Sequence, residues 1–300
     1  MKLQDVKKVG VVGAGTMGGT IAAAIATRYP IVVKEENKKL ADKSLERIKG
    51  LLPALSARGV ITEVEREVAA SRISMTADFA PFKECQVIIE AVPDDLDLKI
   101  KMYSELNKVC SAETIFATTS SLVSIAALAA GSGRPDKMIG THFCMPAHMM
   151  QLVEVAPCMQ TSDETTAFMM EFLAKGIGKA PIKTKDRPGY IVNFMLFPFL
   201  IQAVKAFELG LGTPEEIDNA VKMGLGHRMG PFDVMDMSNM EDVSGFTKLY
   251  EQLNDPKFAL PVTLKKMSEA GFWGQKVGKG FYLYDEKGKK VGPNPDILGK

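Results

Sequence analysis

Two residues on neighbouring segments of the chain are of the types that pass a proton. His142, one of three histidines, ends a short apolar run, and Glu154 lies in the next run along the chain. A carboxylate beside an imidazole fixes its tautomer and stabilises the imidazolium formed when the ring takes a proton. From spacing alone, a satisfied core histidine and a solvated glutamate fit equally well.

Two hydrogen-bonding residues could accompany this pair. Ser121 follows an apolar run at 115–117, and Asn193 lies near the start of a long apolar segment. A hydroxyl and an amide can both hydrogen-bond a substrate oxygen. A metal site made of His142, Cys144 and His148 is a poorer hypothesis, because no fourth ligand has a suitable spacing.

A glycine-rich motif near the N-terminus is typical of a dinucleotide-binding turn. The pattern G-x-G-x-x-G is formed by Gly13, Ala14, Gly15, Thr16, Met17 and Gly18. The first glycine permits a tight turn, the second lets a pyrophosphate approach the backbone, and the third lets the helix pack on the strand. The following helix offers free N–H groups and a positive dipole to phosphates.

The acid after the next apolar run predicts which dinucleotide is bound. Glu35 follows the run at 31–33 and is placed to accept hydrogen bonds from the adenosine ribose hydroxyls. A 2′-phosphate would meet Glu35 and Glu36 with no obvious arginine beside them, so NAD is expected to be favoured over NADP. A solvated strand end is the alternative for Glu35.

The elements that position these residues follow from the apolar runs. Runs of strand length occur at 9–12, 31–33, 87–89, 115–117, 138–140 and 152–155, and an alternating stretch at 181–184 closes this half. Helical segments separate them, which is typical of an α/β domain. With the glycine motif, the pattern predicts a Rossmann-type dinucleotide-binding domain over residues 1–187. Residues 37–70 predict a helical hairpin inserted in it, with breaks at Pro53 and Gly59.

The chain changes character after residue 187. Residues 190–209 have the pattern of a long apolar helix, whose polar residues argue against a membrane span. A capping box predicts another helix from Thr213. We expect residues 188–300 to be an all-α substrate and dimerisation domain with a loose tail at 285–300. The long helix is too apolar for one small domain to cover, so a homodimer through this domain is predicted.

Composition limits the partners and the compartment. A formal net charge of +1 gives no field that would favour nucleic acid or an anionic membrane. The four cysteines form no CxxC pair, which is typical of free thiols in a reducing compartment. The uncharged stretch 9–27 has the length of a secretory signal, but its five glycines and its dinucleotide motif favour a cytoplasmic protein.

Further short motifs connect these features. They are Thr119-Ser120-Ser121, His142-Phe143-Cys144-Met145-Pro146, Pro188-Gly189-Tyr190-Ile191-Val192-Asn193, Met229-Gly230-Pro231-Phe232 and Gly278-Lys279-Gly280-Phe281-Tyr282. With these motifs the chain resembles the 3-hydroxyacyl-CoA dehydrogenases over nearly its whole length. The resemblance implies NAD-dependent oxidation of a (3S)-3-hydroxyacyl-CoA to the 3-oxoacyl-CoA, or the reverse reduction. Short-chain 3-hydroxybutyryl-CoA or acetoacetyl-CoA is the first expectation.

The resemblance also implies roles for the matching residues. The catalytic group would be His142, Glu154, Ser121 and Asn193, with Ser121 and Asn193 contacting the substrate. The cofactor-side positions would be Asp94, Lys99, Ser121 and Lys276, with Asp94 replacing the usual Glu. Arg58 matches a basic position in the insertion that contacts coenzyme A, and a solvated helix charge explains Arg58 equally well.

Several positions depart from the family pattern. Phe194 stands where the family normally has Arg, Ser238-Asn239 replaces a usual Gly, and two further departures bear on the chemistry. Met145 precedes Pro146 where Asn is usual, or Ser in multifunctional enzymes, and Thr119 stands where Asn usually precedes the catalytic serine by two residues. Methionine cannot donate a hydrogen bond, and losing one oxyanion donor can cost about 3 kcal/mol. We expect slower turnover, or a pocket fitted to an unusual acyl group.

Two other functions are consistent with the residues. One keeps the fold and changes the substrate to a CoA-free hydroxy acid, such as a sugar acid. The other is a structural protein that binds the cofactor with little turnover. The substrate is what separates the three hypotheses.

Overall fold

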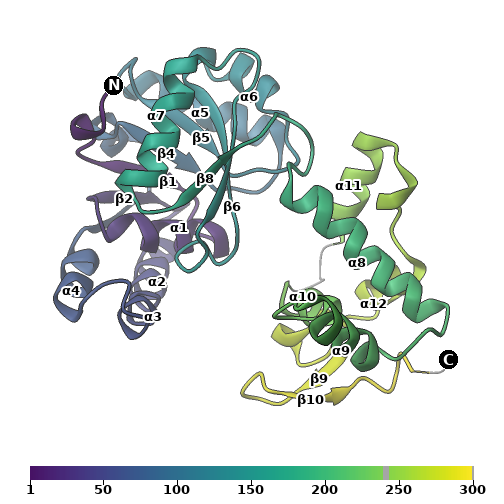
Figure 1. The fold of residues 1–300 in the computed structure, drawn as a ribbon. Helices are drawn as coiled ribbons and strands as arrows, with labels where there is room; N and C mark the ends of the chain where they lie inside the picture. Colours follow the sequence, from purple (N-terminus) through teal and green to yellow (C-terminus); the bar gives the residue numbers. More distant parts are fainter. Residues whose placement is uncertain (239–242, 299–300) are drawn as a thin grey trace. The chain divides into compact units, whose positions relative to one another are not determined.

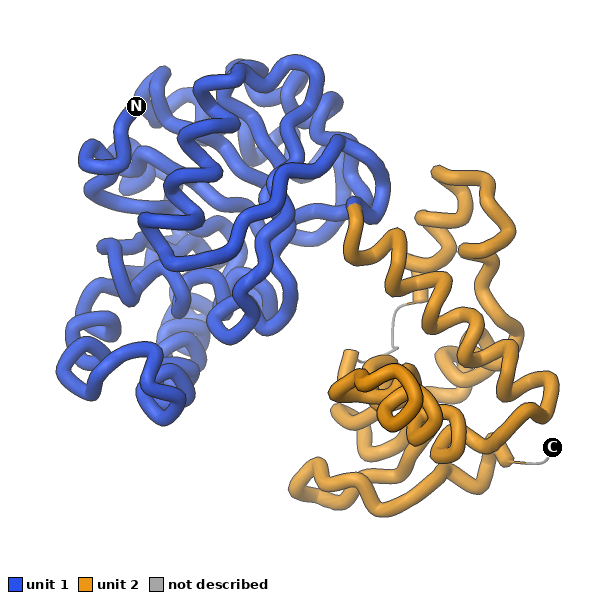
Figure 2. The backbone as a smooth tube through the Cα atoms, in the orientation of Figure 1, with its two compact units in different colours: residues 1–190 blue, residues 191–300 orange. Residues whose placement is uncertain are grey.

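The structure is a computed structural model that describes residues 1–238 and 243–298. The chain divides into two compact units, residues 1–190 and 191–300 (Figures 1 and 2). Within the described residues, no helix is both long enough and apolar enough to cross a membrane.

The first unit is built on one eight-stranded sheet with the order β3-β2-β1-β4-β5-β6-β7-β8. Its strands are β1 (Val9–Val12), β2 (Ile31–Lys34), β3 (Ile73–Thr76), β4 (Val87–Glu90), β5 (Ile115–Thr118), β6 (Met138–Phe143), β7 (Leu152–Ala156) and β8 (Ala180–Lys183). The first six strands are parallel, β7 is antiparallel to β6, and β8 is parallel to β7.

The central strands read as continuous apolar runs because both faces of the sheet are covered. β1, β4 and β5 are buried along their whole length, as expected for parallel strands between two helical layers. All seven predicted strands are present. The sequence reasoning missed β3, an edge strand in which Ser74 and Thr76 interrupt the apolar pattern.

Helices cover both faces of this sheet (Figure 1). The helices of this unit are α1 (Thr16–Ala26), α2 (Lys38–Lys49), α3 (Leu52–Ala57), α4 (Glu63–Ser71), α5 (Leu96–Val109), α6 (Ile125–Gly131) and α7 (Asp163–Glu171). Ile21 of α1 and Phe168 of α7 belong to one buried cluster. Tyr103 of α5 and Leu128 of α6 belong to the other. The result is the doubly wound α/β architecture predicted from the sequence.

The insertion between β2 and β3 contains three helices, not the predicted pair. Pro53 lies in the first turn of α3, where its missing N–H would have no helical partner in any case. It therefore begins a helix where the sequence analysis had placed a break. Gly59, with a φ of +69°, ends that short helix region.

The second unit is mainly helical. Its described elements are α8 (Val192–Glu208), α9 (Pro214–Leu225), α10 (Pro231–Ser238), α11 (Ser244–Leu253), α12 (Val262–Glu269), β9 (Tyr282–Tyr284) and β10 (Lys290–Pro293). Ile201, Phe232 and Phe281 lie in its buried core. The predicted capping box is present, since the Thr213 amide donates to Glu216 Oε2 at 2.8 Å and the Thr213 hydroxyl accepts from the Glu216 amide.

The prediction of a loose tail is wrong for the described part of residues 285–300. β10 pairs antiparallel with β9 across an irregular register. Asn294 is fully buried, and its Nδ2 donates to the carbonyl of Gly280 at 2.8 Å. The polar and glycine residues of this segment gave no strand pattern in the sequence. The strand is held by main-chain and amide hydrogen bonds, not by burial of alternating apolar side chains. The second unit is therefore not purely α-helical.

Candidate active site

Several of the predicted site residues of the first unit follow parallel strands at one edge of the sheet. β1, β2, β4, β5 and β6 are parallel, so the residues that follow them meet at their carboxyl ends. The glycine loop follows β1, Ser121 lies just beyond β5, and His142 is near the end of β6. Open α/β sheets bind ligands outside this edge, where the strand order reverses.

The glycine loop has the shape that a dinucleotide needs. Gly13 has a φ of +87°, and a Cβ there would lie 2.8 Å from the Ala91 carbonyl oxygen. A Cβ on Gly18 would overlap the Gly13 carbonyl, whereas a Cβ on Gly15 would have no neighbour within 4 Å. Gly15 caps α1 without a side chain, which leaves the helix N-terminus open to an anion. These residues fit NAD.

Glu35 follows β2 and is held by the insertion. Its Oε1 accepts a hydrogen bond from Ser44 Oγ at 2.9 Å, and Arg47 Nη2 donates to the Ala14 carbonyl. No arginine was expected beside Glu35 from the sequence. The three-residue spacing of Ser44 and Arg47 on one helix face was the signal that could have revealed them.

His142 and Glu154 meet, a pairing that their spacing alone had left open. The antiparallel register of β6 and β7 places the two residues opposite each other. His142 Nδ1 lies 2.7 Å from Glu154 Oε2, and the two residues are 9% and 1% exposed. Because Glu154 occupies Nδ1, Nε2 is the ring nitrogen left to exchange a proton with a substrate.

Tyr190 supports both the histidine and the serine loop, a role that the sequence analysis missed. Its ring centroid lies 5.5 Å from that of His142. Its hydroxyl donates to the Ser120 carbonyl at 2.8 Å, and the Gly189 amide donates to the Ser121 carbonyl at the same distance. Burial raises the pKa of Tyr190, so the hydroxyl stays a neutral donor.

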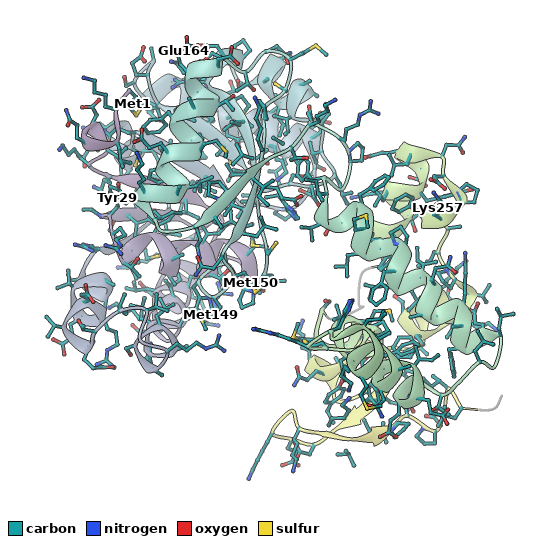
Figure 3. The ribbon with its side chains drawn as sticks, in the orientation of Figure 1. Met1, Tyr29, Met149, Met150, Glu164 and Lys257 are labelled. Carbon is teal, nitrogen blue, oxygen red and sulfur yellow. The ribbon has the colours of Figure 1, made fainter. Side chains whose placement is uncertain are left out.

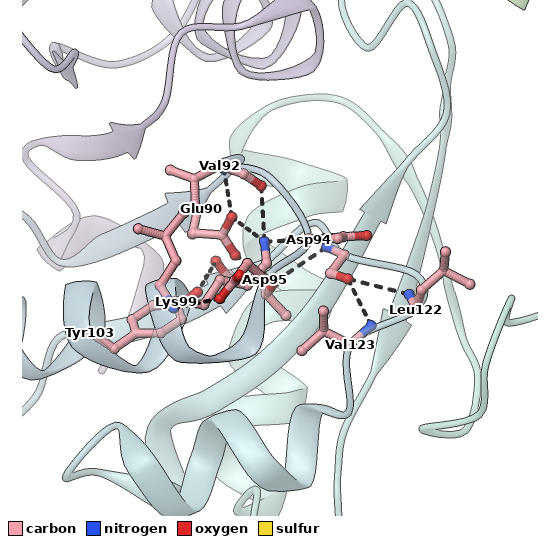
Figure 4. Close-up of polar contacts among 12 residues, drawn as sticks. Glu90, Val92, Asp94, Asp95, Lys99, Tyr103, Leu122 and Val123 are labelled. Carbon is pink, nitrogen blue, oxygen red and sulfur yellow. Dashed lines mark hydrogen bonds and ion pairs between the residues drawn. The ribbon is translucent and has the colours of Figure 1, made fainter. Parts of the chain in front are cut away.

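A buried ion pair fixes the ends of β4 and β5 (Figure 4). Lys99 Nζ lies 2.5 Å from Glu90 Oε1 and donates to the Val92 carbonyl at 3.0 Å. The other oxygen of Glu90 accepts from Thr118 Oγ1 at 2.7 Å. Burial raises the pKa of Glu90, and the Lys99 ammonium opposes that shift. The pair anchors the two strands that lead to the predicted cofactor-side loops.

This network changes how Lys99 can act on a cofactor. The Lys99 side chain is fully buried, whereas that of Asp94, 3.3 Å away, is 30% exposed. A buried ammonium reaches a ligand through its neighbours, so Asp94 is the more accessible of the two. Contact of either residue with NAD stays a prediction.

The loop after β6 is tied to α1 and to Lys179, the residue before β8. The Ala147 amide donates to Thr20 Oγ1 of α1 at 3.1 Å, and Lys179 Nζ donates to the Ala147 and Met150 carbonyls. Figure 3 labels Met149 and Met150 of this loop. Burial lowers the pKa of His148, and the charges of Lys179 and Arg58 lower it further. Arg58 itself is exposed at the end of α3.

Two predicted residues belong to the second unit. Asn193 lies half-buried in the first turn of α8, and Lys276 is exposed in the short turn at 275–277. Their contacts with the substrate and the cofactor stay predictions.

Comparison with known proteins adds an independent line of evidence. Residues 8–187 match the family model described as 3-hydroxyacyl-CoA dehydrogenase, NAD binding domain. Residues 189–284 match 3-hydroxyacyl-CoA dehydrogenase, C-terminal domain. A probable 3-hydroxybutyryl-CoA dehydrogenase of Deinococcus radiodurans is 36% identical over 279 residues, 92% of this chain and 100% of that protein.

Solved structures agree. The (S)-3-hydroxybutyryl-CoA dehydrogenase of Ralstonia eutropha has a TM-score of 0.86 at 34% identity, covering 94% of this chain and 100% of that chain. A diketoreductase that acts on dicarbonyl compounds has a TM-score of 0.79 at 29% identity, covering 93% and 99%.

Proposed function

Because the chain belongs to the 3-hydroxyacyl-CoA dehydrogenase family, we propose that it interconverts short-chain (3S)-3-hydroxyacyl-CoA and 3-oxoacyl-CoA. The proposed substrates are 3-hydroxybutyryl-CoA and acetoacetyl-CoA. The observation that carries the proposal is the buried His142–Glu154 pair at the sheet edge that also holds the glycine loop. The names of relatives at about 35% identity support the short chain.

In the proposed mechanism, His142 Nε2 takes the proton of the 3-hydroxyl. NAD⁺, held on the backbone of residues 13–18, would supply the hydride acceptor for the carbon that bears this hydroxyl. Glu154 holds the tautomer that leaves Nε2 free, and it stabilises the imidazolium that forms. Ser121 and Asn193 donate hydrogen bonds to the substrate oxygen.

The binding residues are proposed from the same arrangement. The phosphates of NAD would lie on the backbone of residues 13–18, and its adenosine ribose on Glu35. Asp94, Lys99, Ser121 and Lys276 would complete the cofactor side. Arg58 would bind the phosphates of coenzyme A as a charged hydrogen-bond donor.

We propose different roles for the two parts of the chain. Residues 1–187 would bind the cofactor, and residues 188–300 would complete the substrate site and form a homodimer. Large apolar side chains of the second unit are exposed, among them Met195, Leu209, Leu211, Met223 and Leu225. All four cysteines are free, which supports a reducing compartment, the cytoplasm.

A substrate panel tests the function. Oxidation of NADH is followed with acetoacetyl-CoA, free acetoacetate and a sugar keto acid, each at several concentrations. Turnover with the thioester alone supports the proposal. Binding of NADH without turnover of any of the three would overturn it and favour a structural role.

A second function is favoured by two observations. Met145, 49% exposed after β6, stands where the family usually has a hydrogen-bonding residue, and a diketoreductase shares the fold. A CoA-free carbonyl compound is therefore the second candidate substrate class. Higher kcat/KM with acetoacetate or the sugar keto acid than with acetoacetyl-CoA would establish it.

A further inference from the structure

The corner where the adenosine ribose is proposed to bind contains a short relay of side chains from α2. We propose that Ser44 is a positioning residue that orients Glu35 to select NAD over NADP, and that Arg47 links Ser44 to the glycine loop. The proposal rests on the proposed contact between Glu35 and the ribose.

The relay joins the two loops that would hold the adenosine half of the cofactor. Arg47 Nη2 donates to the Ala14 carbonyl in the glycine loop and lies 3.4 Å from Ser44 Oγ. Ser44 Oγ lies 2.9 Å from Glu35 Oε1 at the end of β2. Helix α2 thus connects the turn after β1 to the acid after β2.

The donors and acceptors of this relay fix its direction. A guanidinium only donates, a carboxylate only accepts, and a hydroxyl has one proton. Because Glu35 can only accept, the proton of Ser44 must point to Glu35, and Arg47 can donate only to the lone pairs of Ser44 Oγ. Ser44 is 6% exposed, so little water competes for that hydrogen bond.

One held oxygen leaves the other oxygen of Glu35 to a ligand. The Glu35 amide donates to the Thr76 carbonyl at 3.0 Å, so the backbone is fixed as well as the side chain. A carboxylate restrained in this way needs less ordering when it accepts hydrogen bonds from ribose hydroxyls. It also keeps its negative charge where a 2′-phosphate would lie. Loss of the Ser44 hydroxyl should therefore weaken NADH binding more than NADPH binding.

The test compares cofactor affinities in a double-mutant cycle. Dissociation constants of NADH and NADPH are measured by fluorescence titration, without substrate, for the wild type, Ser44→Ala, Glu35→Ala and the double variant. Ser44→Ala should raise the dissociation constant of NADH about three- to tenfold and leave that of NADPH within about twofold of the wild-type value. In the Glu35→Ala background, Ser44→Ala should have no further effect on either cofactor.

Matched variants separate positioning from general damage. Ser71→Ala removes a hydroxyl in the same insertion that donates only to its own helix, at the Val68 carbonyl, and should change neither affinity. Ser44→Cys, nearly the same size and a weak donor, repeats the test if Ser44→Ala does not fold. Arg47→Ala should change the dissociation constant of NADH in the same direction as Ser44→Ala does.

The outcomes are distinguishable. If Glu35→Ala leaves the NADH to NADPH preference unchanged, the proposed ribose contact fails. If Glu35→Ala changes the preference and Ser44→Ala does not, only the positioning role fails. Equal weakening of both cofactors by Ser44→Ala, persisting in the Glu35→Ala background, would also overturn it.

Discussion

His142 can act as a base only while a neighbour fixes its tautomer. Glu154 provides that neighbour at 2.7 Å, from a position that is 1% exposed. An amide in its place could hydrogen-bond the ring but would carry no charge to stabilise an imidazolium.

Glu154→Gln should therefore reduce kcat for acetoacetyl-CoA reduction about 100-fold or more, because a less basic and less well-oriented ring would hold less of the imidazolium that protonates the substrate oxygen. The KM for NADH should stay within about twofold of the wild-type value. Glu154 lies on β7, and three strands of the sheet separate β7 from β1, the strand that the glycine loop follows. Steady-state kinetics with acetoacetyl-CoA check this. A kcat within threefold of the wild type would remove Glu154 from the mechanism.

Single residues also show what the sequence could not predict. The resemblance implied a cofactor-side position for Lys99, and the sequence did not show that its ammonium is buried against Glu90. A motif gives a position along the chain, whereas the direction of a long side chain depends on the packing around it. Arg47 was overlooked because its partners, Ser44 and the Ala14 carbonyl, are joined only by the fold.

At the scale of elements, apolar runs predicted the strands that are buried on both faces. The apolar runs did not predict the direction of each strand. The antiparallel direction of β7 brings Glu154 opposite His142. Elements held by polar contacts were harder to find. Helix α3 begins at a proline that was interpreted as a break, and β10 lies in a segment that was interpreted as a tail.

The β9 region is joined to α10 by a buried acid. Asp236 accepts hydrogen bonds from the amides of Phe281 and Tyr282, each at 2.9 Å, and is 1% exposed. Burial raises the pKa of Asp236 to about 6. The folded protein therefore holds a proton, between about pH 4 and 6, that the unfolded chain releases.

The contribution of Asp236 to the free energy of unfolding should fall as pH rises through this range, and the loss should be complete above about pH 6. Relative to Asp236→Asn, which cannot ionise, the wild type should lose up to about 3 kcal/mol between pH 4 and 7. Denaturant unfolding followed by Trp273, the single tryptophan, reports on this unit. A difference between the two proteins that does not vary with pH would contradict this.

At the scale of the whole molecule, the two domain models of one family match the chain in the same order as its two compact units. An α/β unit is followed by a mainly helical one. The sequence could predict this order because the change from strand runs to helical runs is abrupt. Which surfaces associate depends on exposure, which a sequence does not give directly.

The proposed homodimer predicts a sedimentation coefficient of a dimer at micromolar concentration. Leu209→Glu with Met223→Glu, at side chains that are 76% and 81% exposed, should shift the protein toward monomer, because charge would enter an apolar interface. Val64→Glu on α4, 72% exposed, is the matched control and should leave the dimer intact. A wild type that sediments as a monomer would refute the dimer.

The central claim is that His142 moves the proton while the glycine loop holds the cofactor. The most direct test is kcat for acetoacetyl-CoA reduction by His142→Ala, measured together with the dissociation constant of NADH. We predict a kcat at least about 1000-fold lower with NADH affinity within twofold of the wild type. A kcat within tenfold of the wild type would contradict the account.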